Sequence, residues 1–136
     1  MTGYTKPLPH IDEANRPYWQ GLKEGRVTFL TCASCDRMRV YTFRKCPHCG
    51  SEDSKWTELP GTGEIWSLGR FHQVYFEGFR DEAPYTVAIV QLDDGPRVYS
   101  NIVETDADDV RIGARVEPVF DPVTEDVTLL KFRVRP

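Results

Sequence analysis

The sequence predicts a mainly β protein with an N-terminal helix, a rubredoxin-like four-cysteine zinc ribbon and a C-terminal five-stranded OB-fold barrel. Two paired C-x2-C spacings predict the ribbon. Five strand-like segments, of which the first is long and bent, predict a small Greek-key barrel of the OB type, although five strands also suit other small barrels. We divide the chain into an arm and short helix (1–26), the ribbon (27–56) and the barrel (57–136).

The helix is expected within "NRPYWQGLKEG". Asn15 suits the N-cap, a proline suits the first turn, and Gly25 suits the exit. Tyr18 and Leu22 lie four residues apart on one face, with Trp19 beside them. This apolar face should be covered, either by the protein's own body or by a partner subunit.

The four cysteines form two knuckles on a predicted hairpin of "VTFLT" and "RVYTF"; they are Cys32, Cys35, Cys46 and Cys49. Each knuckle directs two sulfurs to one point, and four thiolates in a tetrahedron suit Zn²⁺. Such a site leaves no open position for water, so we expect one structural zinc ion per chain. Two alternatives are a pair of disulfides, which is unusual in the cytosol, and a rubredoxin-type iron site with the same ligands.

Basic residues surround the predicted metal site. Arg37, Arg39, Arg44 and Lys45 either offset the negative charge of the metal centre or contact an anionic ligand or an acidic partner. His48 lies between two metal ligands and is expected on the surface.

The barrel strands are expected in "GEIWSLGRFHQVYF", "YTVAIVQL", "RVYSNIV", "RVEPVF" and "VTLLKFRV". Gly69, near the middle of the first, predicts a bulge or a sharp bend. The second is apolar on both faces, which predicts a central, buried strand. "TELPG" is interpreted as a short joint (57–61), so the ribbon and the barrel should pack rigidly. The loop Tyr75–Pro84 joins the first two strands at an end of the barrel where OB folds often bind ligands.

Composition excludes several classes of protein. The chain has 136 residues and a formal net charge of −4, which counts against a nucleic-acid binder. No apolar run approaches the roughly 20 residues that span a bilayer, and the first residues lack the apolar core of a signal peptide. We therefore expect a cytoplasmic protein. Its histidines are His10, His48 and His72, and the sequence pairs none of them with a nucleophile, so no self-sufficient active site is predicted.

Taken in order, the motifs resemble a known family. They are the Trp-containing helix, the paired knuckles, "GTGEIWS", "PYTVAIVQLDDGPR" and "IGARV", and they cover roughly residues 15 to 134. The chain resembles the acyl-CoA-associated zinc-ribbon/OB-fold family, domain-of-unknown-function family thirty-five. It departs from the family pattern at Asp36, where many members carry glycine, and at "YTFRK", where many have a Pro-rich segment. Neither departure removes a metal ligand, but both leave the local shape of the ribbon in question.

The resemblance implies a non-catalytic accessory subunit of a CoA-ester-processing complex in lipid or steroid metabolism. The implied partner is a thiolase-superfamily subunit (a thiolase, acyltransferase or retro-aldolase) or, second, a hotdog-fold hydratase. The partner brings the catalytic residues. The small subunit holds the complex together and helps form the acyl-CoA site, so a CoA ester is the implied bound substrate of the complex.

Candidate contacts with acyl-CoA or the partner are aromatic and arginine side chains: Trp19, Arg70, Phe76, Phe79, Arg80 and Arg97. Tyr18, Phe71 and Tyr75 are further aromatic candidates for an interface. The arginines could also be ordinary solvated charges at strand edges. Two other functions remain open at this stage: a single-stranded nucleic-acid-binding OB/zinc-ribbon module, and a rubredoxin-like electron carrier.

Overall fold

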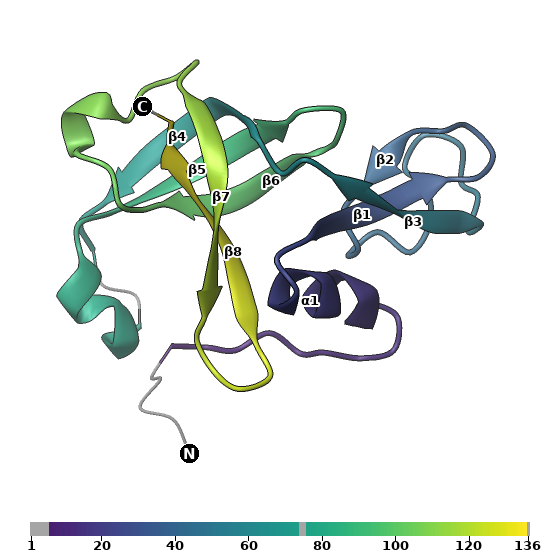
Figure 1. Ribbon diagram of the computed structural model, residues 1–136, viewed down its shortest axis with the longest axis horizontal. Helices are drawn as coiled ribbons and strands as arrows, with labels where there is room; N and C mark the ends of the chain where they lie inside the picture. Colours follow the sequence, from purple (N-terminus) through teal and green to yellow (C-terminus); the bar gives the residue numbers. More distant parts are fainter. Residues whose placement is uncertain (1–5, 74–75, 136) are drawn as a thin grey trace.

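The computed structural model describes residues 6–73 and 76–135 (Figure 1). One helix, α1 (Arg16–Lys23), precedes the ribbon strands β1 (Val27–Cys32), β2 (Met38–Arg39) and β3 (Ser54–Leu59). The barrel strands are β4 (Gly63–Phe71), β5 (Tyr85–Leu92), β6 (Arg97–Ile102), β7 (Arg115–Pro122) and β8 (Thr128–Val134). Two 3-10 helices, η1 (Glu77–Glu82) and η2 (Ala107–Asp109), lie in connections. The predicted fold class is confirmed.

The ribbon is a three-stranded antiparallel sheet in the order β2-β1-β3. Its second strand is shorter than expected, because "RVYTF" turns after Arg39 instead of continuing in the sheet. The Arg39 guanidinium explains the turn: its Nε donates to the carbonyl oxygen of Phe43 at 2.8 Å, which folds this segment back. The sequence did not predict β3, which pairs along its whole length with β1.

Helix α1 begins and ends as predicted, but the Asn15 side chain does not cap it. Gly25 has a φ of +75° and its N–H donates to the carbonyl of Leu22 at 3.1 Å, as a helix exit requires. Asn15 occupies the predicted N-cap position and its backbone carbonyl accepts from the N–H of Tyr18 at 3.1 Å, but its side chain makes no capping bond. Instead it accepts from the N–H of Asp12 and donates to the carbonyl of His10, both at 2.9 Å. Asn15 therefore shapes the approach to the helix.

The apolar face of α1 packs on the protein's own body. Trp19 is 7% exposed and Leu22 1% exposed, and both belong to one core cluster that spans the ribbon and the barrel. Tyr18 stacks on Tyr41 of the ribbon with ring centroids 4.9 Å apart, and it also contacts Phe29. Figure 1 shows α1 beside β8 and below the ribbon strands. The helix thus joins the two parts through side-chain contacts.

The joint between ribbon and barrel is short and close-packed. Thr57 to Leu59 belong to β3, so the connection is shorter than the predicted 57–61 segment. Gly61 has a φ of +85°, and a Cβ at this position would lie 3.1 Å from side-chain atoms of both Val27 and Pro118. Only glycine can adopt this left-handed backbone conformation while leaving room for the Val27 and Pro118 side chains.

The barrel closes in the order β4-β5-β6-β8-β7. Every strand pair is antiparallel except β6–β8, which is parallel and joined at Ile102 and Phe132. The register shifts between Ile65 and Ser67 of β4 and is continuous at Gly69, so the bulge lies at Trp66 and not at Gly69, where a bulge or a sharp bend was predicted. The extra residue is Trp66, which leaves its indole half exposed.

Two further expectations can be compared with the fold. The first barrel strand stops at Phe71, short of its expected end, and His72 follows it at an exposed position. Among the described residues, no helix is both long and apolar enough to cross a membrane.

Candidate metal centre and partner surface

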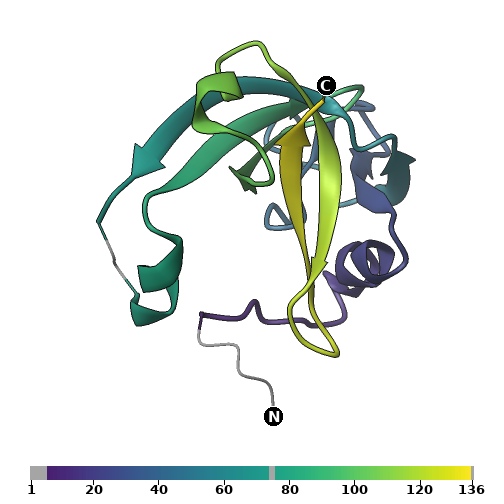
Figure 2. The same cartoon turned by 60° about the vertical axis from the view of Figure 1, so that its left-hand side comes forward.

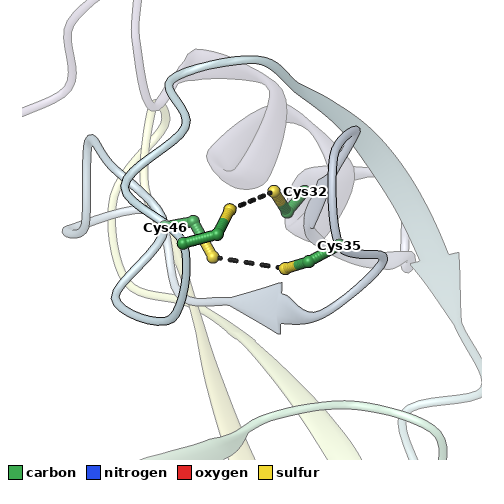
Figure 3. Close-up of side chains that lie close together, drawn as sticks. Cys32, Cys35 and Cys46 are labelled. Carbon is green, nitrogen blue, oxygen red and sulfur yellow. Dashed lines mark hydrogen bonds between the residues drawn. The ribbon is translucent and has the colours of Figure 1, made fainter.

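Four cysteine sulfurs gather at the end of the ribbon sheet (Figure 3). The Sγ atoms of Cys32 and Cys49 lie 3.5 Å apart, and those of Cys35 and Cys46 lie 3.6 Å apart. All four lie within 4.8 Å of one another. Four sulfurs bound to one zinc at 2.3 Å would be about 3.8 Å apart, so the site fits a single tetrahedral ion. All four cysteines are free thiols, which argues against two disulfides.

The first knuckle holds its ligand through two backbone hydrogen bonds. The N–H of Cys32 donates to the carbonyl of Arg37 at 2.8 Å, and the N–H of Asp36 donates to the carbonyl of Cys32 at 3.0 Å. These bonds wrap the chain around the cysteine and direct its sulfur to the metal position.

The second knuckle repeats this pattern bond for bond. The N–H of Cys46 donates to the carbonyl of Ser51 at 2.8 Å, and the N–H of Gly50 donates to the carbonyl of Cys46 at 2.8 Å. Gly50 has a φ of +79° and Asp36, at the equivalent position, has a φ of +63°. Aspartate is one of the few residues that tolerate this left-handed conformation. The first knuckle therefore keeps its shape despite lacking the glycine of the family pattern.

The knuckle backbone also favours thiolates. Burial opposes ionisation of Cys46, but hydrogen bonds from the backbone N–H groups of Cys49 and His48, together with those from the Cys35 and Cys49 side chains, outweigh it and lower the pKa of this thiol to about 6. The backbone N–H of Cys35 likewise lowers the pKa of the Cys32 thiol. Thiolates are the form that binds a metal ion, so each knuckle contributes one sulfur poised for coordination.

The basic residues near the site divide into two groups. Arg44 and Lys45 are exposed, and Arg37 is also exposed, with its Nη1 2.6 Å from Nδ1 of His48. His48 is thus the surface residue that the sequence predicted. Arg39 is only 4% exposed, and its buried Nη1 has no hydrogen-bond partner among the described residues. The other nitrogens of this guanidinium donate to backbone carbonyls, Nε to Phe43 at 2.8 Å and Nη2 to Arg44 at 3.4 Å, so Arg39 holds the segment that precedes Cys46.

The candidate contact residues do not form one site. Trp19 lies in the core. Arg70 is on β4, where its Nη1 donates to Oγ1 of Thr86 at 3.2 Å. The Arg97 guanidinium lies over the Trp66 ring, 3.9 Å from its centroid. The remaining three, Phe76, Phe79 and Arg80, lie at or in η1, and Tyr75 lies outside the described residues.

A chain of contacting aromatic rings, one pair stacked and two tilted, joins η1 to the ends of β4 and β5. Phe79 contacts Tyr85 at a centroid distance of 5.3 Å, Tyr85 stacks on Phe71 at 5.7 Å, and Phe76 contacts Phe79 at 6.3 Å. Arg80 binds the Glu77 carboxylate through its Nε at 2.6 Å and its Nη2 at 2.8 Å. This arginine is paired within the chain, so the segment offers apolar contact more readily than it offers a cation for phosphate.

Sequence reasoning missed two exposed aromatic residues on the barrel. Trp66 is 47% exposed and Tyr99 79% exposed. The signal was present, because Tyr99 alternates with the buried Val98 on β6 and must therefore point away from the core.

A cavity of about 1150 Å³ lies at the connection between β6 and β7. Its wall carries both carboxylates and guanidinium groups, including Glu104, Asp106, Arg111, Arg115 and Arg135. Its lining contains none of the predicted contact residues.

Comparisons with known proteins identify the two parts of the chain. Residues 19–54 match the family model of the ChsH2 rubredoxin-like zinc ribbon domain, and residues 56–121 match that of the ChsH2 C-terminal OB-fold domain. The four sulfurs described above are therefore the zinc site of a zinc ribbon.

Several relatives cover most of the chain. A DUF35 domain-containing scaffold protein of Methanothermobacter thermautotrophicus is 38% identical over 105 residues, which are 74% of this chain and 75% of that protein. One from Methanocaldococcus jannaschii is 31% identical over 79% of this chain and 77% of its own length. A probable enoyl-CoA hydratase alpha subunit of Thermomonospora curvata is 34% identical over 94% of this chain, which spans only 40% of that protein's length.

A solved structure gives the same answer. A chain of the Ltp2-ChsH2(DUF35) aldolase superimposes with a TM-score of 0.79 and 32% identity, over 93% of this chain and 98% of that one. The resemblance seen in the sequence motifs is confirmed, and this chain belongs to the DUF35 family of zinc-ribbon and OB-fold proteins.

Proposed function

We propose that this chain is a non-catalytic accessory subunit of a CoA-ester-processing enzyme complex, which it stabilises and whose acyl-CoA site it helps to form. One observation carries the proposal: nearly the whole chain is similar to the DUF35 component of an aldolase complex. The scaffold proteins among its relatives support the same role.

The chemistry of the described residues supports a role without catalysis. Every cysteine lies in the metal centre, where four thiolates fill the coordination sphere of zinc and leave no nucleophile or open position. His48 contacts Arg37 on the ribbon surface. Within residues 6–73 and 76–135 no histidine is recorded in contact with a nucleophilic side chain. The zinc ion, one per chain, would be structural.

The proposed partner is a thiolase-superfamily subunit, with a thiolase, acyltransferase or retro-aldolase activity. The aldolase described as Ltp2-ChsH2(DUF35) supports this choice. A hotdog-fold hydratase is the second candidate, supported by the relative described as a probable enoyl-CoA hydratase alpha subunit. Both partners would act on a CoA ester.

Within such a complex, the η1 aromatic residues would contact the acyl group or the partner. Phe76 is 55% exposed and extends the ring stack that begins at Phe71. Arg80 is bonded to Glu77, so we do not assign the CoA phosphates to it.

Co-expression tests the proposal. The chain is produced with each thiolase-superfamily and hotdog-fold subunit encoded near it, and complexes are measured by light scattering after size exclusion. Turnover of CoA esters is then compared for the partner alone and for the complex. The expected result is a stable complex with a thiolase-superfamily subunit that turns over a CoA ester faster than the partner alone. A stable complex with a hotdog-fold hydratase subunit instead would identify that subunit as the partner in place of the thiolase-superfamily subunit. A monodisperse chain that binds neither class of subunit would overturn the proposal.

A further inference from the structure

Strand β5 has an apolar face that the chain itself leaves uncovered. Its even-numbered residues are buried in the barrel core, among them Ala88 and Val90. Its odd-numbered residues Tyr85, Val87 and Ile89 point away from that core and are only half-buried. A strand that is apolar on both faces is typical of one covered on both sides. Here one side is covered by the barrel and the other is open.

The neighbouring strands extend this open face. Ile89 of β5 lies opposite Tyr99 on β6 and Ser67 on β4. Next to Ser67, the bulged Trp66 exposes its indole, and Tyr99 is the most exposed of the large hydrophobic residues of the described chain. Three adjacent strands therefore contribute apolar side chains to one surface.

This surface continues into the η1 aromatic stack. Phe71 lies opposite Tyr85 at the far end of the β4–β5 pair, and their rings stack. Figure 2 shows β4 and β5 as a long curved pair that leads to η1. We name the outer apolar band by its members Trp66, Phe71, Tyr85, Val87, Ile89 and Tyr99. Contiguous apolar surface of this kind marks an interaction site more often than scattered exposed residues do.

The charges at the band select its occupant. Arg97 is the cationic residue among the described outward residues of β4, β5 and β6 beside the band. Its guanidinium lies over the Trp66 ring, and its Nε donates to Oε1 of Gln91 at 3.0 Å. At the other end, η1 carries Glu77, Asp81 and Glu82, against the cations Arg80 and Lys6. These three carboxylates and two cations carry a net charge of −1, with the Asp81 carboxylate outside the two ion pairs, which disfavours the phosphates of nucleic acid or of CoA. This charge favours a protein surface with an apolar centre and basic residues at one edge.

We propose that the outer apolar band is the docking surface for the catalytic subunit, oriented so that basic residues of that subunit face η1. This inference rests on the proposed function and adds to it the face through which the partner binds. Trp66 and Tyr99 are the expected anchors, because large aromatic residues contribute most of the affinity at protein interfaces. The metal centre lies at the opposite end of the molecule from η1 (Figure 1) and would stay outside this contact.

The test uses the partner subunit found by co-expression and four single variants. Tyr99→Ser and Trp66→Ser should each raise the Kd of the complex about tenfold or more. Phe43→Ser is the matched control, because Phe43 is 50% exposed, close to the 47% of Trp66, but lies on the ribbon. It should change the Kd by less than about twofold. Asp81→Lys should slow association several-fold at low salt and less at high salt.

Hydroxyl-radical footprinting of the wild-type chain keeps the test decisive if a variant fails to fold. Modification of Trp66 and Tyr99 should fall on complex formation while that of Phe43 stays constant. A wild-type complex with unchanged affinity in both aromatic variants, or with undiminished labelling, overturns the docking surface and leaves the proposed function standing. The absence of any complex overturns both. If the chain formed concentration-dependent dimers that were lost in Tyr99→Ser, the face would bind a second copy of the chain. If the chain bound a single-stranded oligonucleotide with a steep salt dependence, the face would bind nucleic acid. Either result overturns the proposal.

Discussion

The ribbon and the barrel of this chain are closed by different means. The ribbon has three short strands, one of only two residues, and four sulfur atoms hold its open end. The barrel is closed by strand pairing around apolar side chains such as Ile65, Val90 and Phe132, each at most 1% exposed. About thirty residues cannot bury enough surface to fold alone, whereas five paired strands can bury far more. Metal coordination therefore closes the end of the ribbon that holds the cysteines, whereas Val27 and Phe29 join the rest of the ribbon to the core of the barrel.

Removing the metal should produce the largest difference between the stability of the ribbon and that of the barrel. Structural zinc contributes on the order of 10 kcal/mol in zinc-finger peptides. Chelation, or Cys49→Ser, should therefore unfold the ribbon while the barrel persists. Hydrogen exchange followed by mass spectrometry should show the amides of β1 and β3 losing protection and those of β5 retaining it. Equal loss in β5 would show that the barrel depends on the metal as well.

A core deletion in the barrel should have the converse effect. Phe132→Ala removes a fully buried ring and should lower the free energy of unfolding by about 3–5 kcal/mol. Urea denaturation measures the loss, and the zinc content per chain should not change. Phe43→Ala, at an exposed site, should change stability by less than about 0.5 kcal/mol. A fall in zinc content in the Phe132 variant would contradict the separation.

The joint can be tested with two glycines that share a backbone conformation. Gly61→Ala should cost about 2 kcal/mol, because it combines a left-handed backbone with contacts to Val27 and Pro118. Gly25→Ala meets no atom within 4 Å and should cost only the conformational term of about 1 kcal/mol. Thermal unfolding of both variants measures the difference. Equal losses would show that ribbon and barrel are not in close contact at Gly61.

The barrel should also respond to acid through Asp93. The Arg115 guanidinium, followed by the Thr62 hydroxyl, lowers the pKa of this carboxyl from 3.8 to about 2. A carboxyl with a lowered native pKa stabilises the fold above pH 4, and this contribution is lost as the pH falls from about 4 to 2. Solvent screens the pair, so the effect should be below about 1 kcal/mol. Asp93→Asn should be less stable at neutral pH, and its free energy of unfolding from urea titrations should fall less steeply between pH 4 and 2. An unchanged pH dependence would show that the Asp93–Arg115 pair does not contribute to stability.

The smallest expected effect lies in the first knuckle. Asp36→Gly should stabilise the ribbon by about 0.5 kcal/mol, because the relief of left-handed strain slightly exceeds the added entropy of an unfolded glycine. Gly50→Asp makes the opposite change at the equivalent position and should destabilise by a similar amount. The rate of zinc release to a chelator measures the effect of both variants on the ribbon. Identical rates would show that the residue at these two positions does not affect the stability of the ribbon.

Local patterns explain why some elements were predictable. Strand β5 has the predicted bounds, because eight apolar-rich residues are bounded by Pro84 and the Asp-Asp-Gly turn. Strand β3 was missed because "SKWTEL" has exposed polar residues and becomes a strand only by pairing with β1. The bulge at Trp66 likewise depends on the register against β5.

The metal centre was predictable for the same reason, and the contact surface was not. Two C-x2-C spacings specify four ligands within a few residues of each other. Exposure is decided by the whole fold, which buries Trp19 and exposes Trp66 although both are tryptophans on amphipathic elements. Strand alternation would have pointed to Tyr99, but only once β6 was placed between β5 and β8.

The position of α1 has a consequence for the order in which the chain can fold. This helix contacts β7 and β8, the last strands of the barrel along the chain, as well as β1. Its contacts with β8 span more than a hundred residues of sequence and carry a high loop-closure cost. During translation the ribbon could bind zinc as soon as Cys49 emerges, yet the face of α1 turned to the barrel would stay open until β8 leaves the ribosome. A nascent chain should therefore expose this hydrophobic face until the more than one hundred residues between α1 and β8 have been synthesised.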